Sequence, residues 1–129
     1  MSENSAGTLP AVQALIAVTL GGGLGSALRY LVSTPLNERM PALGTATVNV
    51  VGSLVLGVLV GWSSTREGGG TLRLALGTGL LGGFTTFSAW MAEVADVVDR
   101  PARLALTVVV PVVAGVAAAA IGLRLGRAI

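Results

Sequence analysis

The fold of this chain is decided near its middle, by the stretch Gly79–Trp90, which reads Gly-Leu-Leu-Gly-Gly-Phe-Thr-Thr-Phe-Ser-Ala-Trp. Adjacent glycines and adjacent threonines lie there, inside a long apolar segment where a membrane helix should be most regular. Glycine weakens a helix by about 1 kcal/mol relative to alanine, and threonine is also a poor helix former. The stretch therefore predicts a break, whose freed carbonyl groups must face protein, water or an ion because lipid offers no donor.

The composition is that of an integral membrane protein. The chain has 129 residues, of which 53% are hydrophobic and 11% charged, and its mean hydropathy is +0.83. Soluble domains of this size are much less apolar. The chain contains no histidine and no cysteine, so the commonest general base and the thiolate metal ligands are missing, and we expect no enzyme. The basic residues are arginines placed singly or in pairs, which gives no basic run for nucleic acid.

Apolar segments predict an all-α membrane protein with four transmembrane helices in a single domain, residues 1–129. The expected helices cover residues 11–32, 43–62, 72–98 and 104–125. Each is long enough to cross about 30 Å of hydrocarbon at about 1.5 Å per residue. Polar residues predict loops at 35–41 and 63–70. The third helix would measure about 40 Å if it were straight, which favours an interruption at Gly79–Trp90.

The arginines are divided equally between the two sides of this arrangement. Arg66, Arg73, Arg124 and Arg127 lie on the side of the termini, and the other side holds Arg29, Arg39, Arg100 and Arg103. Because the excess of basic residues sets orientation in the membrane, equal numbers predict insertion in both orientations. An antiparallel, dual-topology dimer is the assembly that follows. The alternative is one orientation, set by a few decisive charges.

A row of small and polar residues follows one face of the second expected helix. Thr45, Asn49 and Ser53 recur at every fourth position, and Gly57 continues the row. Polar side chains that face lipid are costly, so the row should face another helix or a watery path. Two interpretations are open: pore lining, which we favour for Asn49, and hydrogen bonding between closely packed helices.

Two aromatic residues and a carboxylate follow the predicted break. Phe87 and Trp90 are three positions apart and share a helix face, with Thr86 on the same stripe and Glu93 a turn further along. The edge of an aromatic ring is positive, so ring edges suit the path of an anion. The alternatives are core packing for the rings and a solvated charge at the helix end for Glu93.

The first expected helix contains a glycine-rich run, Gly21–Gly25, and an arginine one turn beyond it, Arg29. The run lets another backbone approach closely. Arg29 would lie at or just inside the interface of the membrane. It either extends its guanidinium group to that interface or lines a water-filled vestibule that collects anions.

Three motifs together resemble the Fluc (CrcB) fluoride channels along nearly the whole chain. Residues 21–30 read GGGLGSALRY, which is similar to the family's GGxxGAxxRY. Residues 44–57 read GTATVNVVGSLVLG, which is similar to its GTxxVNxxGSFxxG. Residues 82–90 read GGFTTFSAW, which is similar to its GGFTTFSTF.

The resemblance implies a fluoride-specific channel in the cell membrane that gives passive fluoride efflux and so lowers the toxicity of fluoride in the cytoplasm. It also implies a dual-topology homodimer with antiparallel pores, in which amide and hydroxyl donors and ring edges replace the water around fluoride. The residues expected at the pore and its vestibule are Arg29, Asn49, Ser53, Thr86, Phe87, Ser88, Trp90 and Glu93.

The resemblance further implies a central Na⁺ ion that is structural and not transported. Backbone carbonyl groups hold this ion at the helix breaks of both subunits, and in this chain those carbonyl groups belong to Gly82 and Thr85. This agrees with the independent argument that an interrupted membrane helix leaves carbonyl groups suited to a cation.

Two departures from the family bear on the pore. Trp90 stands where the family usually has phenylalanine, so it keeps a ring and adds an N–H donor. The fourth expected helix offers a single hydroxyl, that of Thr107, where the family has several. Either one pore wall is unusually apolar, or a second homologous subunit supplies the missing groups in a heterodimeric channel. The balanced arginines favour the homodimer.

Two other functions compete with the channel. A small multidrug-type transporter needs a titratable carboxylate deep in the membrane, and the first two expected helices contain none. A non-conducting assembly subunit would explain the glycines as packing residues, but it leaves the Asn49 row and the aromatic pair unexplained.

Overall fold

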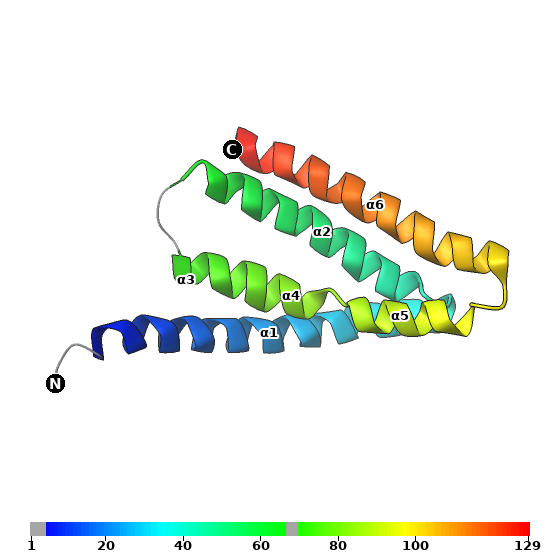
Figure 1. The fold of residues 1–129 in the computed structure, drawn as a ribbon, viewed down its shortest axis with the longest axis horizontal. Helices are drawn as coiled ribbons and strands as arrows, with labels where there is room; N and C mark the ends of the chain where they lie inside the picture. Colours follow the sequence, from blue (N-terminus) through cyan, green and yellow to red (C-terminus); the bar gives the residue numbers. More distant parts are fainter. Residues whose placement is uncertain (1–4, 67–69) are drawn as a thin grey trace.

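The structure is a computed structural model that describes residues 5–66 and 70–129. Within these residues the chain is helical apart from short connections, which confirms the predicted all-α fold (Figure 1). The elements are α1 (Ser5–Arg39), α2 (Leu43–Ser64), α3 (Gly70–Arg73), the π-helical segment η1 (Leu74–Leu81), α4 (Gly82–Phe84), α5 (Phe87–Asp96) and α6 (Pro101–Ala128). Among the described residues, 3 helices are long and apolar enough to cross a membrane, namely α1 from Pro10 onward, α2 and α6.

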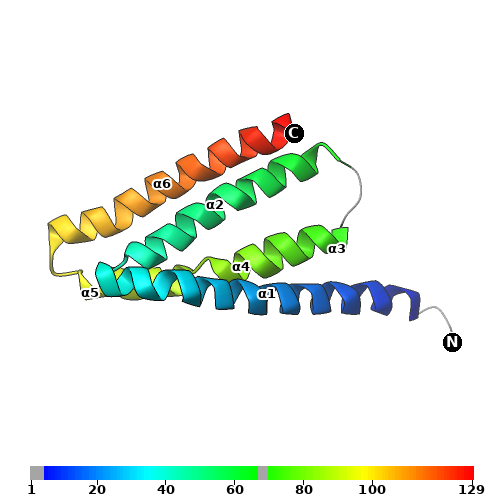
Figure 2. The same ribbon diagram turned by 180° about the vertical axis from the view of Figure 1, so that it is seen from behind.

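The helices form two packed pairs. α2 packs along α6, and α1 packs along η1 and α4 (Figure 1). Figures 1 and 2, which view the molecule from opposite sides, show the start of α1 and the end of α6 at the same end of the bundle. This arrangement brings α2, α5 and α6 together around the connection between α4 and α5.

Glycines allow both pairs to pack with their backbones in close approach. A methyl group at Gly57 of α2 would collide with the carbonyl oxygen of Ala119 in α6. A methyl group at Gly25 of α1 would collide in the same way with the carbonyl oxygen of Leu80 in η1. Such contacts are typical of helices that associate through small residues in membranes. The close approach expected at Gly21–Gly25 is thus confirmed.

The large apolar side chains face outward. Within the part of the chain that the structure describes, the buried hydrophobic residues are only Val48, Leu81 and Ala118. By contrast, the side chain of Leu20 is 71% exposed and that of Val116 is 66% exposed. A surface of this kind is suited to lipid or to a partner helix and not to water.

The first helix differs most from its expected bounds. α1 extends beyond both ends of the expected helix at 11–32, and the expected first loop is wrong for residues 35–39. Pro35 lies inside α1, where the ring removes one helical hydrogen bond without ending the helix. Asn37 explains the extension, because its Oδ1 accepts a 2.7 Å hydrogen bond from the N–H of Gly44 at the start of α2. The side chain of Asn37 is therefore satisfied by protein, whereas Glu38 and Arg39 of the same turn are exposed.

The other helix bounds differ less. α2 agrees closely with the expected 43–62, and α6 begins at Pro101 because a proline fits the first turn of a helix. The expected third helix, 72–98, is divided among α3, η1, α4 and α5. The expected loop at 63–70 lies partly outside the described residues.

Candidate functional site

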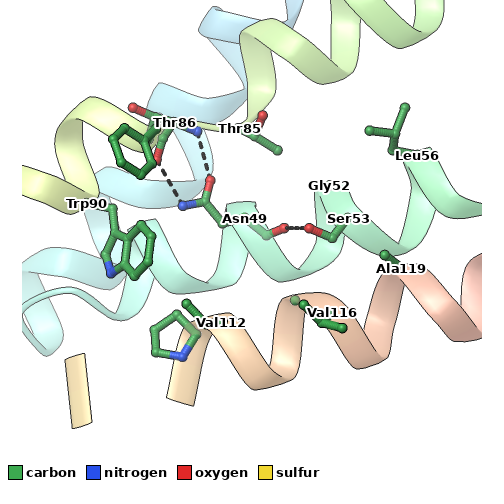
Figure 3. Close-up of a pocket in the computed structure, with 13 residues that line it drawn as sticks. Asn49, Gly52, Ser53, Leu56, Thr85, Thr86, Trp90, Val112, Val116 and Ala119 are labelled. Carbon is green, nitrogen blue, oxygen red and sulfur yellow. Dashed lines mark hydrogen bonds between the residues drawn. The ribbon is translucent and has the colours of Figure 1, made fainter. Parts of the chain in front are cut away.

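The connection between α4 and α5 consists of Thr85 and Thr86, whose backbones are extended. If the helix continued, the N–H of Thr86 would bond to the carbonyl oxygen of Gly82. It bonds instead to Oδ1 of Asn49 at 2.8 Å, and the carbonyl oxygen of Thr86 accepts from Nδ2 of Asn49 at 2.9 Å (Figure 3). The side chain of Asn49 thus pairs with this peptide segment as a neighbouring strand would, and the carbonyl group of Gly82 loses its helical donor.

Thr86 also begins α5. Its Oγ1 accepts a 3.2 Å hydrogen bond from the N–H of Ala89 and lies 3.4 Å from Oγ of Ser88. A threonine in this N-cap position stabilises a helix by about 1 kcal/mol. Threonine, which is unfavourable inside a helix, is therefore favourable at position 86, where α5 starts.

Arg29 of α1 lies against the same connection. Its Nη1 donates a 3.2 Å hydrogen bond to the carbonyl oxygen of Thr85. In a continuing helix this carbonyl would accept from Ala89, whose N–H bonds to Thr86 instead. The connection is therefore held by side chains from α1 and α2, which supply the partners that lipid cannot.

A groove of about 440 Å³ opens beside the connection, between α2, α5 and α6 (Figure 3). Its lining residues are Asn49, Gly52, Ser53, Leu56, Thr85, Thr86, Phe87, Trp90, Pro111, Val112, Gly115, Val116 and Ala119. The amide and hydroxyl groups among them come from α2 and from the connection. The wall formed by α6 carries neither a hydroxyl nor a charge.

The two aromatic residues meet at the start of α5. The rings of Phe87 and Trp90 are perpendicular, with centroids 5.8 Å apart and planes at 80°, so the edge of one ring meets the face of the other. Phe87 is 69% exposed. The indole N–H of Trp90 donates a 2.8 Å hydrogen bond to the backbone carbonyl of Thr107 in α6.

The groove brings together some of the residues expected at the pore and leaves others outside. Asn49, Ser53, Thr86, Phe87 and Trp90 line it, as does Thr85 of the expected cation site, whereas Arg29, Ser88, Glu93 and Gly82 do not. Ser53 also donates from Oγ to the carbonyl oxygen of Asn49 at 2.7 Å, within α2. The two interpretations of the Asn49 row are therefore not exclusive, because the same side chains line a groove and bond to the protein.

Glu93 is held by α2, away from the groove. Oγ1 of Thr45 donates a 2.5 Å hydrogen bond to Oε1 of Glu93, and Thr45 is only 2% exposed. The second carboxyl oxygen, Oε2, is buried and has no hydrogen-bond partner within residues 5–66 and 70–129. A buried oxygen without a donor is costly, so this carboxyl group has capacity for one more donor.

An apolar wall from the fourth helix was one of the two alternatives that the sequence offered, but the residues that form this wall were not predicted. Pro111, Gly115 and Ala119 recur at every fourth position, as do Val112 and Val116. This spacing places each set along the helix on one side. Apolar residues on a membrane helix give no signal that separates a groove from a lipid-facing surface, so only the packing of α6 against α2 reveals this wall.

Comparisons with known proteins agree with the resemblance in the sequence. The family described as "CrcB-like protein, Camphor Resistance (CrcB)" matches residues 16–123, which include the whole groove lining. A protein of Novosphingobium aromaticivorans named fluoride-specific ion channel FluC is 45% identical over 121 residues, covering 87% of this chain and 94% of the relative. The protein of the same name from Methylobacterium sp. (strain 4-46) is 43% identical over 118 residues, with the same coverage of 87% and 94%. Fluoride-specific ion channel FluC 2 of Mycobacterium tuberculosis is 41% identical over 123 residues, covering 92% of this chain and 94% of the relative.

Proposed function

The chain belongs to the CrcB family, and on this premise we propose that it is a fluoride-specific ion channel and not an enzyme. In this proposal it lies in the cell membrane as a multi-pass protein. It lets fluoride leave the cytoplasm passively and so lowers the toxicity of the ion. The names of the relatives support fluoride as the permeant ion.

The observation that carries the proposal is the groove beside Thr85 and Thr86. In a chain with a strongly apolar surface, this groove gathers the side chains of Asn49, Ser53 and Thr86 next to two aromatic rings. Amide and hydroxyl donors and positive ring edges can replace the water around a small anion. Among the described residues, none of those that line the groove carries a positive charge, so an anion would bind weakly enough to leave.

The remaining expected residues take places around this path. We assign Ser88 and Glu93 to the approach to the groove, and Arg29 to its vestibule. Ser88 is linked to the groove through the hydroxyl of Thr86, whereas Glu93 is bonded to Thr45 at the start of α2, beyond the groove lining. The carboxyl group with capacity for one more donor then faces the approach and not the narrow part of the path.

We propose that the working unit is an antiparallel, dual-topology homodimer, with α3, η1, α4 and α5 of each chain acting as one interrupted third span. The equal division of the arginines supports two orientations. The exposure of Phe87, at 69%, and of many large apolar side chains supports a second chain or lipid against this surface. The single domain of residues 1–129 is then one half of the channel.

A heterodimer is the second candidate assembly, and one observation favours it. The α6 wall of the groove, from Pro111 to Ala119, carries no hydroxyl group. A second homologous subunit with hydroxyls on its fourth helix would provide donors that this chain lacks. Fluoride flux through the purified chain alone separates the two assemblies.

The structural, non-transported Na⁺ ion also remains a proposal, with Gly82 and Thr85 as its carbonyl ligands. The carbonyl of Gly82 fits this role, because Asn49 takes the N–H that would otherwise bond to it. The carbonyl of Thr85 fits only in part, because it already accepts a hydrogen bond from the charged Arg29 side chain. Two cations at one carbonyl repel each other, so Na⁺ binding at Thr85 requires Arg29 to move.

The competing functions are weaker. A small multidrug-type transporter needs an exposed titratable carboxylate in the substrate path, whereas Glu93 is bonded to Thr45 and lies outside the groove. A non-conducting assembly subunit accounts for the close glycine contacts but not for a groove that gathers polar groups.

Growth in fluoride tests the proposed function in cells. Bacteria without a fluoride exporter of their own should grow at raised fluoride concentrations when they express this chain. They should not grow when they express Asn49→Ala at the same membrane level. The matched control is Thr47→Val, which also removes a polar group from α2. Thr47 suits this purpose because it bonds only to Leu43 in its own helix and lies outside the groove. Equal growth with and without the wild-type chain would contradict the proposal.

A further inference from the structure

The hydrogen bond between Trp90 and Thr107 fills a gap in α6. In a regular helix the carbonyl of Thr107 accepts from the N–H of residue 111, four positions along. Residue 111 is a proline, which has no N–H. The indole N–H of Trp90 donates to this carbonyl at 2.8 Å. An uncompensated carbonyl in an apolar environment is costly, so the indole occupies an acceptor that Pro111 leaves free.

The same bond fixes the aromatic pair at the groove. Trp90 is held at its N–H end by α6, and its ring meets the ring of Phe87 at 80° with 5.8 Å between centroids. Phe87 itself is 69% exposed, so the protein encloses little of it. The orientation of the Phe87 ring therefore depends on the Trp90 ring, and the orientation of the Trp90 ring depends on the Thr107 carbonyl.

We propose that Trp90 is a positioning residue of the pore, which uses the carbonyl freed by Pro111 to set the orientation of Phe87 in the groove. Its N–H is bonded to protein and is not a donor to the permeating anion, so Trp90 offers that anion only its ring edge. This inference rests on the proposed function, because it assigns a role within the fluoride path.

The test compares Trp90→Phe in two backgrounds, with Pro111 present and with Pro111→Ala. Trp90→Phe keeps a ring but removes the N–H, and Pro111→Ala restores a backbone N–H for the Thr107 carbonyl. With Pro111 present, Trp90→Phe should lower the midpoint of thermal unfolding in detergent. In the Pro111→Ala background the same substitution should change that midpoint little. Trp62→Phe is the matched control, because Trp62 packs under the guanidinium of Arg66, outside the groove, and its effect should be equal in both backgrounds.

Fluoride efflux from liposomes separates positioning from simple stabilisation. Trp90→Phe should slow efflux in both backgrounds by about fivefold, the factor that corresponds to one ordinary hydrogen bond, because the ring loses its anchor whether or not α6 is repaired. If Pro111→Ala restores the efflux rate of Trp90→Phe together with its stability, Trp90 is only a structural residue and the proposal is wrong. An equal loss of stability in both backgrounds would also overturn it, because the bond would then not serve the gap at Pro111.

The thermal-unfolding and efflux measurements together distinguish a failure of this inference from a failure of the proposed function. If the wild-type chain carries no fluoride, the proposed function fails and the positioning role fails with it. The stability comparison needs no flux and still decides whether Trp90 closes the gap at Pro111.

Discussion

Asn49 and Thr86 are joined by two hydrogen bonds, of 2.8 and 2.9 Å, which link both ends of one side-chain amide to both backbone groups of one residue. Asn49 belongs to α2, and Thr86 is the residue from which α5 starts. The N–H of Thr86 has no helical partner, and lipid provides none, whereas its carbonyl group also accepts the first helical hydrogen bond of α5. The pair therefore fixes α2 to the start of α5 and lines the groove at the same time.

Asn49→Ala should destabilise the protein and abolish fluoride efflux. The substitution leaves the N–H of Thr86 without a partner and leaves its carbonyl with only the helical hydrogen bond of α5, which should lower the free energy of unfolding by about 1 to 3 kcal/mol. Denaturant unfolding in detergent micelles measures this change. Asn49→Asp tests the two hydrogen bonds separately. It keeps an acceptor for the N–H of Thr86 but places a carboxylate oxygen against the carbonyl oxygen of Thr86. A loss under about 0.5 kcal/mol in Asn49→Ala, the level of a surface substitution, would contradict the role of this pair.

Substitution by alanine should change the stability of the protein in opposite directions at two glycines of α1. Gly25→Ala places a methyl group on the carbonyl oxygen of Leu80 and should destabilise the protein by about 1 to 3 kcal/mol or more. Gly23→Ala meets nothing within 4 Å in this chain and should stabilise α1 by up to about 1 kcal/mol. Unfolding midpoints of the two variants, measured side by side, check the prediction. Equal effects would mean that α1 and η1 are not packed as described.

Replacing Ala42 with glycine should raise the thermal stability of the protein. It joins α1 to α2 with φ 65, in the left-handed region, which costs an L-residue about 1 to 2 kcal/mol. Ala42→Gly should therefore raise the thermal midpoint. Ala46→Gly, inside α2, should lower it, because glycine costs about 1 kcal/mol in a helix interior. A lower midpoint for Ala42→Gly would show that the connection has another conformation.

Arg29→Gln should increase the affinity for Na⁺, if Na⁺ binds at Gly82 and Thr85. Removing the guanidinium frees the Thr85 carbonyl and removes a repulsive charge, which should lower the Na⁺ concentration for half-maximal thermal stabilisation at least about tenfold. N-methylglucamine replaces Na⁺ in the titration, so that the ionic strength stays constant. Arg39→Gln is the control variant, because Arg39 lies at the exposed end of α1. An unchanged Na⁺ midpoint would mean that the ion does not compete with Arg29.

The helices and one wall of the groove were predictable from the sequence. Apolar segments long enough for a membrane are a strong signal, and the spacing of Asn49 and Ser53 indicated a shared face, which the groove uses. The end of α1 was not predictable, because Pro35 normally indicates a helix end, and the compensating bond of Asn37 joins two separate helices.

The pairing of side chains with backbone could not be read from the sequence either. Asn49 and Thr86 are 37 residues apart, and Arg29 is 56 residues from Thr85. Their residue types indicate hydrogen-bonding capacity but not a partner. Pro111 has no N–H, but the filling of the resulting gap by Trp90 depends on how α5 lies against α6, which the sequence does not indicate.

Whether this chain by itself forms a fluoride channel is decided by efflux from liposomes that contain only the purified chain. We expect rapid release of fluoride, no release of chloride, and loss of fluoride release in Asn49→Ala. No fluoride release from a folded wild-type dimer would contradict the homodimeric channel, and equal release of both anions would contradict its selectivity.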